Sequence, residues 1–183
     1  MRADARRNHD QLLVAARAVV GEHGAEASLR EVARRAGVGL GTLYRHFPTR
    51  DALLEGLLRT EFDALAARAA ELGTAASPRE ALVTWLREGV AWTVEYRGAT
   101  ELMVAAIEDP DSALHASCVA MRAAGTGLLT RAQEAGAARA DLDGTDLFAL
   151  ISAMAWLGAQ PALAPRADHL LDVVVDAVCA PRS

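Results

Sequence analysis

Apolar residues recur every three or four positions through most of the 183-residue chain, which is the spacing of amphipathic helices and not of strands. Breaks rich in glycine, proline, serine and aspartate separate these periodic segments. The spacing predicts helices over about 8–23, 28–36, 40–46, 49–72, 77–96, 99–108, 112–135, 145–159 and 166–179. The predicted fold is therefore all-α, with about nine helices, preceded by a loosely ordered polar arm over residues 2–9.

Two short predicted helices and a tight turn lie between residues 28 and 47. Ser28 stands at the first N-cap, and Glu31 three residues later completes the sequence pattern of a capping box. Gly37 follows the first helix, where a left-handed backbone favours a residue without Cβ. Pro48 ends the second helix. This arrangement predicts a helix-turn-helix, whose second helix lies in the major groove of DNA.

Charge separates along the chain in a way that suits DNA contact through one end. Residues 1–60 carry ten arginines and seven acidic residues, a net charge of +3. Residues 61–183 carry nine arginines and seventeen acidic residues, a net charge of −8. A basic N-terminal segment on an acidic body favours contact with phosphates at that segment only. The arginines of the N-terminal arm either touch phosphates or belong to a solvated terminus.

Residues 41–53, Gly-Thr-Leu-Tyr-Arg-His-Phe-Pro-Thr-Arg-Asp-Ala-Leu, closely resemble the end of the DNA-binding domain of TetR-family regulators. The resemblance covers about residues 8–55. It implies a helix-turn-helix DNA-binding domain over 1–48 and a six-helix ligand-binding and dimerisation domain over 49–183, with the fourth helix shared. It also implies a repressor that binds a palindromic double-stranded DNA operator as a homodimer and is released by a small apolar effector. Residues 85–87 and 132–142 loosely resemble the C-terminal domains called SbtR-like.

The second short helix contains most of the residues expected at DNA. Leu40 and Gly41 lie at its N-terminal end, where backbone approach, shape and contact with thymine methyl groups are available. By resemblance, Thr42, Tyr44 and His46 contact phosphate or groove, and Arg50 matches a backbone-binding position. His46 could instead pack beside the next residue. The predicted DNA-binding set is Leu40, Gly41, Thr42, Tyr44, Arg45, His46 and Arg50.

The resemblance implies an effector cavity in the C-terminal body, where most of the aromatic and sulfur-containing side chains occur. The predicted lining is Trp85, Trp92, Tyr96, Met103, His115, Cys118, Met121 and Phe148. An ordinary helical core explains these residues equally well. The alternative prediction is therefore a non-inducible DNA-binding or architectural protein without an effector pocket.

The last two predicted helices are unusually apolar. In relatives such a pair forms a four-helix bundle with its copy in a second subunit, and a two-fold dimer matches a palindromic site. The predicted dimer interface is Leu147, Leu150, Ile151, Met154, Leu170, Val173, Val174 and Ala177.

Several classes of protein do not fit the sequence. The five histidines are scattered without the grouping of an active site, so we expect no enzyme, metal or cofactor. Cys118 and Cys179 lack metal-ligand spacing and read as reduced thiols. The longest apolar run, 147–159, is shorter than the ~20 residues of a membrane span. We therefore expect a cytoplasmic protein with no membrane partner.

Overall fold

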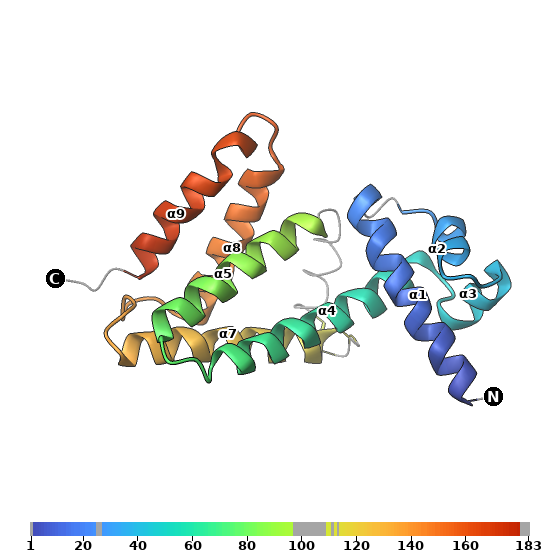
Figure 1. Ribbon diagram of the computed structural model, residues 1–183, viewed down its shortest axis with the longest axis horizontal. Coiled ribbons are helices and arrows are strands. Elements are labelled where there is room, and N and C mark those ends of the chain that lie inside the picture. Colours follow the sequence, from blue (N-terminus) through green and yellow to red (C-terminus); the bar gives the residue numbers. More distant parts are fainter. Residues whose placement is uncertain (1, 25–26, 97–108, 111, 113, 180–183) are drawn as a thin grey trace. The chain divides into compact units, whose positions relative to one another are not determined.

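The computed structural model describes residues 2–24, 27–96, 109–110, 112 and 114–179. All regular structure in these ranges is helical (Figure 1), as predicted. The helices are α1 (Arg2–His23), α2 (Leu29–Arg35), α3 (Leu40–His46), α4 (Arg50–Leu72), α5 (Pro78–Glu95), α7 (His115–Glu134), α8 (Gly144–Ala159), the 3₁₀ helix η2 (Ala164–Arg166) and α9 (Ala167–Val178). The predicted helix over 99–108 lies outside the described residues. No described helix combines the length and apolar character needed to cross a membrane.

The helix starts show which local signals the chain uses. Thr49 and Ser77 cap α4 and α5, since their side-chain oxygens accept the backbone N–H groups three residues later at 3.0 and 3.2 Å. The predicted capping box at Ser28 is wrong, because the Ser28 side chain makes no capping bond. Glu31 is instead held by arginines of its own helix. The predicted loose arm is also wrong, because residues 2–9 continue α1.

The chain divides into two compact units. The N-terminal unit comprises Met1–Glu61 with Glu95–Ala116, and the body unit comprises Phe62–Val94 with Ser117–Ser183. The continuous helix α4 therefore belongs to both. The predicted functional boundary after residue 48 stays a prediction.

The N-terminal unit is built on one apolar core shared by α1 to α4. Its centre contains fully buried side chains from every one of these helices: Leu12, Ala16 and Val19 on α1, Val32 on α2, Leu43 on α3, and Leu53 and Leu57 on α4. Burial of this kind is the main force that holds short helices together, because helices of seven residues are not stable alone. The core therefore sets the position of α3.

The body unit is centred on Trp85 of α5. This side chain is 1% exposed, and its indole N–H donates to the Leu65 carbonyl of α4 at 3.1 Å. Its ring packs against the backbone of Gly125 on α7, where a Cβ atom would lie 2.6 Å from Cζ3. Only glycine permits this approach, so Gly125 lets α5 and α7 pack closely around the ring.

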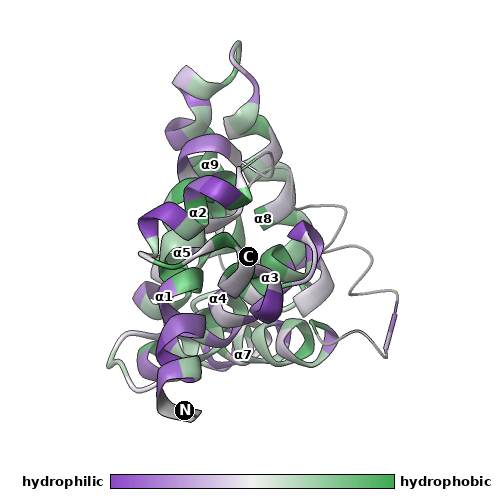
Figure 2. Ribbon diagram, turned by 90° about the vertical axis from the view of Figure 1, so that its right-hand side faces the viewer, coloured by the Kyte–Doolittle hydropathy of each residue, from purple (hydrophilic) through white to green (hydrophobic). Residues whose placement is uncertain are grey.

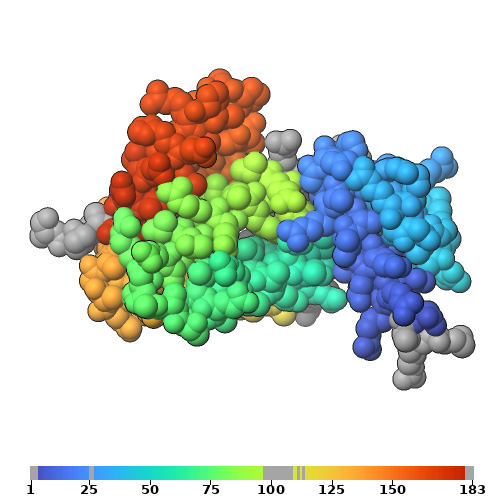
Figure 3. Space-filling view, in the orientation of Figure 1, coloured from blue at the N-terminus to red at the C-terminus, as the bar shows by residue number. Residues whose placement is uncertain are grey.

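Helices α8 and α9 form a hairpin beside α5 within the body unit (Figures 1 and 3). Asp143 caps α8 by accepting the backbone N–H groups of Thr145 and Asp146, and the Asp146 carboxylate completes a capping box. Polar and apolar residues alternate along α1 and α9 (Figure 2), as expected for helices with one buried side. The buried side of α9 consists of Leu171, Val175 and Val178.

Candidate functional site

The turn between α2 and α3 sets the direction of α3. Gly37 has φ +68°, the left-handed region in which a Cβ atom is unfavourable. The Val38 N–H donates to the Ala33 carbonyl at 3.0 Å, and the Gly37 N–H donates to the Arg34 carbonyl at 3.2 Å. This pair of bonds is a Schellman motif, which ends α2 and satisfies its last carbonyls. The predicted role of Gly37 is thus confirmed.

Helix α3 has one buried and one open side. Leu43 is fully buried, whereas Tyr44 is 46% exposed and Gly41 and Arg45 are exposed. Leu40 and Thr42 are half-buried at the N-terminal end. The Arg45 guanidinium donates to the Thr42 hydroxyl at 2.9 Å, so these two side chains form one polar surface. Of the predicted DNA-binding residues on α3, the exposed ones, Gly41, Tyr44 and Arg45, lie on the side away from Leu43.

Three rings meet at the C-terminal end of α3. The His9 ring of α1 stacks on Phe47 with centroids 4.9 Å apart, and it lies 5.9 Å from the His46 ring. Phe47 also lies close to Gly56 of α4, where a Cβ atom would lie 2.9 Å from Phe47 Cε1. Burial and the neighbouring His46 lower the pKa of His9. Sequence reasoning missed His9, because α1 and α3 meet only in the folded unit.

Arg50, the first residue of α4, is less accessible than predicted. Its side chain is half-buried, and its Nε and Nη2 atoms are shielded from solvent. A phosphate contact by Arg50 therefore requires the side chain to turn outward.

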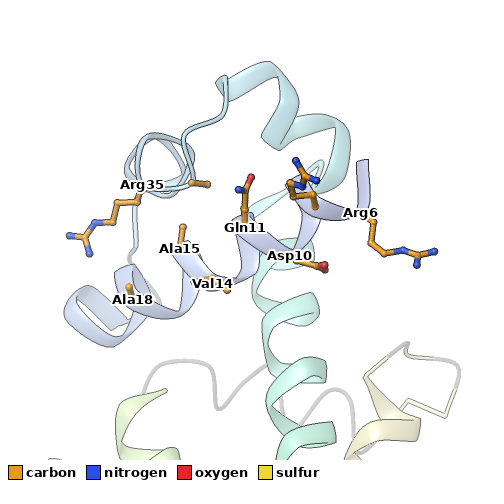
Figure 4. A pocket seen from close by; sticks show the side chains of 9 residues that line it. Arg6, Asp10, Gln11, Val14, Ala15, Ala18 and Arg35 are labelled. Carbon is orange, nitrogen blue, oxygen red and sulfur yellow. The ribbon is translucent and has the colours of Figure 1, made fainter. Parts of the chain in front are cut away.

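Ion pairs brace α2 against α1. Arg35 donates to Glu22 of α1 at 2.6 and 2.7 Å and to Glu31 of its own helix at 2.8 Å. Hydrogen bonds from Arg34 and then Arg35 lower the pKa of Glu31 to about 2. An open groove of about 750 Å³ runs along the same surface (Figure 4). Arg6 and Arg35 point outward at its two ends.

The predicted effector residues do not line one described cavity. In the body unit, Trp85 and Phe148 meet edge-on with centroids 5.9 Å apart, and Trp92 packs on Phe62 at 5.2 Å. Cys118 and Met121 are buried on α7, and burial raises the pKa of the Cys118 thiol. One cavity of the body unit lies between α5 and the α8–α9 hairpin, and another lies between α7 and the start of α8. Neither is lined by a predicted effector residue.

The remaining effector residues lie elsewhere. Tyr96 and His115 belong to the N-terminal unit, and Met103 lies outside the described residues. Tyr96 is 1% exposed beside Glu61, and burial followed by the Glu61 charge raises the pKa of its phenol. Glu61 is itself buried and pairs with Arg17 of α1 at 3.6 Å. Tyr96 is thus part of a polar contact between α1, α4 and the end of α5.

A cavity of about 460 Å³ lies between α5 and the α8–α9 hairpin. It is lined by Arg87, Val90, Ala91, Val94, Met154, Gly158, Ala167, Asp168 and Leu171. None of these residues was predicted for effector binding, because the cavity depends on how the hairpin packs against α5. Among the described residues, no group of three or more His, Cys, Asp or Glu is arranged to hold a metal ion.

Family models match both parts of the chain. Residues 12–57 match the model for bacterial regulatory proteins of the tetR family. Residues 77–178, more than half of the chain, match the C-terminal domain of SbtR-like transcriptional regulators. The chain belongs to the TetR family of transcriptional regulators.

Individual relatives of this TetR-family regulator agree with that assignment. A TetR transcriptional regulator from Streptomyces coelicolor is 35% identical, with 96% of this chain and 99% of that chain covered and a TM-score of 0.74. An HTH-type transcriptional regulator of Staphylococcus aureus (strain USA300) is 34% identical over 64 residues, 34% of this chain and 35% of that protein. That match spans about a third of the curated relative. FadR from Bacillus subtilis, in complex with stearoyl-CoA, shares the fold at 19% identity, with 92% and 98% covered and a TM-score of 0.60.

The predicted dimer residues of this TetR-family regulator fall into two groups. Leu147, Ile151 and Met154 are buried within the chain itself. Leu150, Leu170 and Val174 are half-buried, and Val173 and Ala177 are exposed. Trp156, which sequence reasoning assigned to the body, is 62% exposed on α8. Both sides of α8 are apolar, so the sequence carried no periodic signal for this exposure.

Proposed function

We propose that this TetR-family regulator binds a palindromic double-stranded operator as a homodimer, represses transcription, and is released by a small, mainly apolar effector. The observation that carries the DNA part is the two-sided character of α3. Leu43 anchors the helix in the core while Tyr44 is 46% exposed on the other side. A helix anchored on one side presents its other side to the major groove as a rigid surface.

The N-terminal end of α3 favours readout by close approach. No atom lies within 4 Å of a Cβ atom built on Gly41, so this position is open to solvent. Without a side chain, Gly41 lets the backbone come near the base edges, and Leu40 beside it supplies an apolar contact for thymine methyl groups. Arg45, His46 and an outward-turned Arg50 would then meet phosphates.

The dimer part of the proposal is supported by exposed apolar side chains on α8 and α9. Trp156 is 62% exposed and Val173 is 52% exposed, on the two helices of one hairpin. A large aromatic side chain exposed to solvent is typical of a protein–protein contact surface. We therefore place the dimer surface at Leu150, Trp156, Leu170, Val173, Val174 and Ala177, and we leave out the three buried residues.

Helix α4 offers a route by which a ligand could act on DNA binding. In the N-terminal unit, Gly56 of α4 touches Phe47 at the end of α3. In the body unit, the Leu65 carbonyl of the same helix accepts the Trp85 indole N–H. A ligand that prefers one arrangement of α4 over another would thereby change operator affinity, whereas equal affinity for both would change nothing.

Selection of bound sequences from random duplexes tests the operator. We expect an inverted repeat with half-sites about one helical turn, ~34–36 Å, apart. Tyr44→Ala should weaken binding without changing helix content, and Arg45→Ala should lower the salt slope by about one ion per subunit. Recovery of a single asymmetric site would contradict the proposal.

Sedimentation velocity tests the dimer with a matched pair of variants. Val173→Asp on α9 should shift the protein toward monomer, because it places a charge in the proposed interface. Val119→Asp on α7 should leave the dimer intact, although Val119 is equally exposed at 50%. Equal effects of the two variants would contradict the assignment of the interface.

A non-inducible regulator remains the second candidate, and a specific observation favours it. Several predicted effector residues pack on one another or on glycine, as Trp85 does on Gly125. Operator release in a screen of apolar compounds, repeated on Trp92→Ala, distinguishes the two. If a compound releases the protein from its operator and Trp92→Ala changes that response, the inducible repressor is supported. If no compound releases the protein from its operator, the second candidate is supported. The FadR ligand does not decide this, since a likeness at 19% identity shows the fold alone.

A further inference from the structure

Three aspartates form a ladder along one side of α9. Asp168, Asp172 and Asp176 are spaced four residues apart, so they stand on successive turns. Arg87 of α5 donates to Asp172 at 2.5 Å, and Arg79 of α5 pairs with Asp176 at 3.5 Å. Asp168 has no ion-pair or hydrogen-bond partner among the described residues. Asp172 and Asp176 are thus paired with arginines of α5, whereas Asp168 is not.

Asp168, the aspartate without an arginine partner, lines a cavity. Where α5 would have to supply a third arginine, it has Ala91 and Val94 instead, and these two residues line the 460 Å³ cavity together with Asp168. At Gly158 of α8, which also lines the cavity, a Cβ atom would make an ordinary van der Waals contact with Val94 Cγ2 at 3.5 Å. This volume is within the roughly 300–1,000 Å³ of small-molecule sites.

The walls of the cavity are apolar and its charge is negative. Val90, Val94, Met154 and Leu171 contribute aliphatic or thioether surface. The one cation of the lining, Arg87, is already paired with Asp172, so Asp168 has no cationic side chain as a partner in this cavity. The Asp168 side chain is itself exposed, so it attracts a cation as a surface carboxylate does, and the apolar walls add affinity for a hydrophobic body. An anion would meet this carboxylate without a free cation to balance it.

We propose that the cavity between α5 and the α8–α9 hairpin binds a hydrophobic cation, that is, an amine or onium group on an apolar body. Its positive charge would pair with the Asp168 carboxylate. As the effector site, this proposal rests on the proposed function; as a binding site, it does not. The cavity is separate from the proposed dimer surface, because Val173 and Ala177 lie on another side of α9 from the aspartate ladder.

Isothermal titration calorimetry on the full-length protein without DNA tests the site with two ions of matched size and shape. Tetraphenylphosphonium is the cationic probe and tetraphenylborate the anionic one. We expect the cation to bind with one site per chain and the anion to bind at least tenfold more weakly. Tighter binding of the anion, or no binding of the cation, would overturn the proposal.

Variants separate the site from the general attraction of an acidic protein for cations. Asp168→Asn should weaken binding of the cation about three- to fivefold, as expected for an exposed charge pair. Asp176→Asn removes the same charge from the same helix, but Asp176 pairs with Arg79 and does not line the cavity. This variant should therefore leave binding unchanged. Ala91→Trp should fill the cavity and abolish binding, with circular dichroism confirming an unchanged fold. Equal effects of the two aspartate variants would refute the assignment.

A second assay keeps the two proposals distinguishable. Tetraphenylphosphonium is added to the complex of protein and selected operator. Binding of the cation without operator release would support the cavity and contradict its role as the effector site. Operator release that persists in Ala91→Trp would place the effector elsewhere and overturn the cavity proposal while supporting the inducible repressor.

Discussion

Replacing Gly125 by alanine should destabilise the body unit, although alanine is the better helix former. A Cβ atom at Gly125 would lie 2.6 Å from Cζ3 and 2.9 Å from Cζ2 of Trp85, and closer still to Cη2. The ring cannot retreat freely. Its indole N–H is bonded to the Leu65 carbonyl, and its edge meets Phe148 at 5.9 Å between centroids.

Two opposing effects set the magnitude. Alanine in place of glycine inside a helix stabilises by about 1 kcal/mol. Forcing a methyl group into a filled core costs about 1–3 kcal/mol, and the upper end applies here because the Trp85 ring is rigid and fully enclosed. The expected result for Gly125→Ala is a net loss of about 1–2 kcal/mol in the free energy of unfolding.

Gly127 provides the control on the same helix. It is exposed, and no atom lies within 4 Å of a Cβ atom built on it. Gly127→Ala should therefore show the propensity effect alone and stabilise by about 0.5–1 kcal/mol. Urea unfolding followed by tryptophan fluorescence suits the comparison, because all three tryptophans belong to the body unit. A Gly125→Ala variant as stable as the wild type, or two variants shifted in the same direction, would refute this account of the packing.

Three further predictions test other parts of the chain. Gly56→Ala should displace the Phe47 ring, since a Cβ atom would lie 2.9 Å from Cε1, and should reduce operator affinity in a fluorescence anisotropy titration; unchanged affinity would contradict it. Asp143→Ala should lower the free energy of unfolding by about 1 kcal/mol through loss of the α8 cap, while Asp143→Asn should lose much less. Burial lowers the pKa of His9 below 6.5, so the folded protein binds fewer protons than the unfolded chain. Thermal stability should therefore fall as the pH drops below 6.5, and less steeply in His9→Phe; identical pH profiles would refute the assignment.

Much of the N-terminal unit could be predicted because its signals are local. The limits of α3, the left-handed Gly37 and the cap at Thr49 each depend on a few neighbouring residues. The contiguous stretch 41–53 was enough to indicate the family, which the match over residues 12–57 confirms. Backbone conformation and the spacing of apolar residues are properties of short segments, so the sequence alone determines them.

The tertiary structure decided which of several possible contacts each residue makes. Arg35 could pair with Glu31 of its own helix alone, and in the folded unit it also donates to Glu22 of α1, thirteen residues away. Both sides of α8 are apolar, so periodicity could not separate buried Ile151 from exposed Trp156. Asp168 shares a cavity with Ala91 and Val94 because of how α9 is aligned with α5, whose Arg87 pairs with Asp172. Such alignments depend on packing between segments far apart in the chain, and no local pattern encodes them.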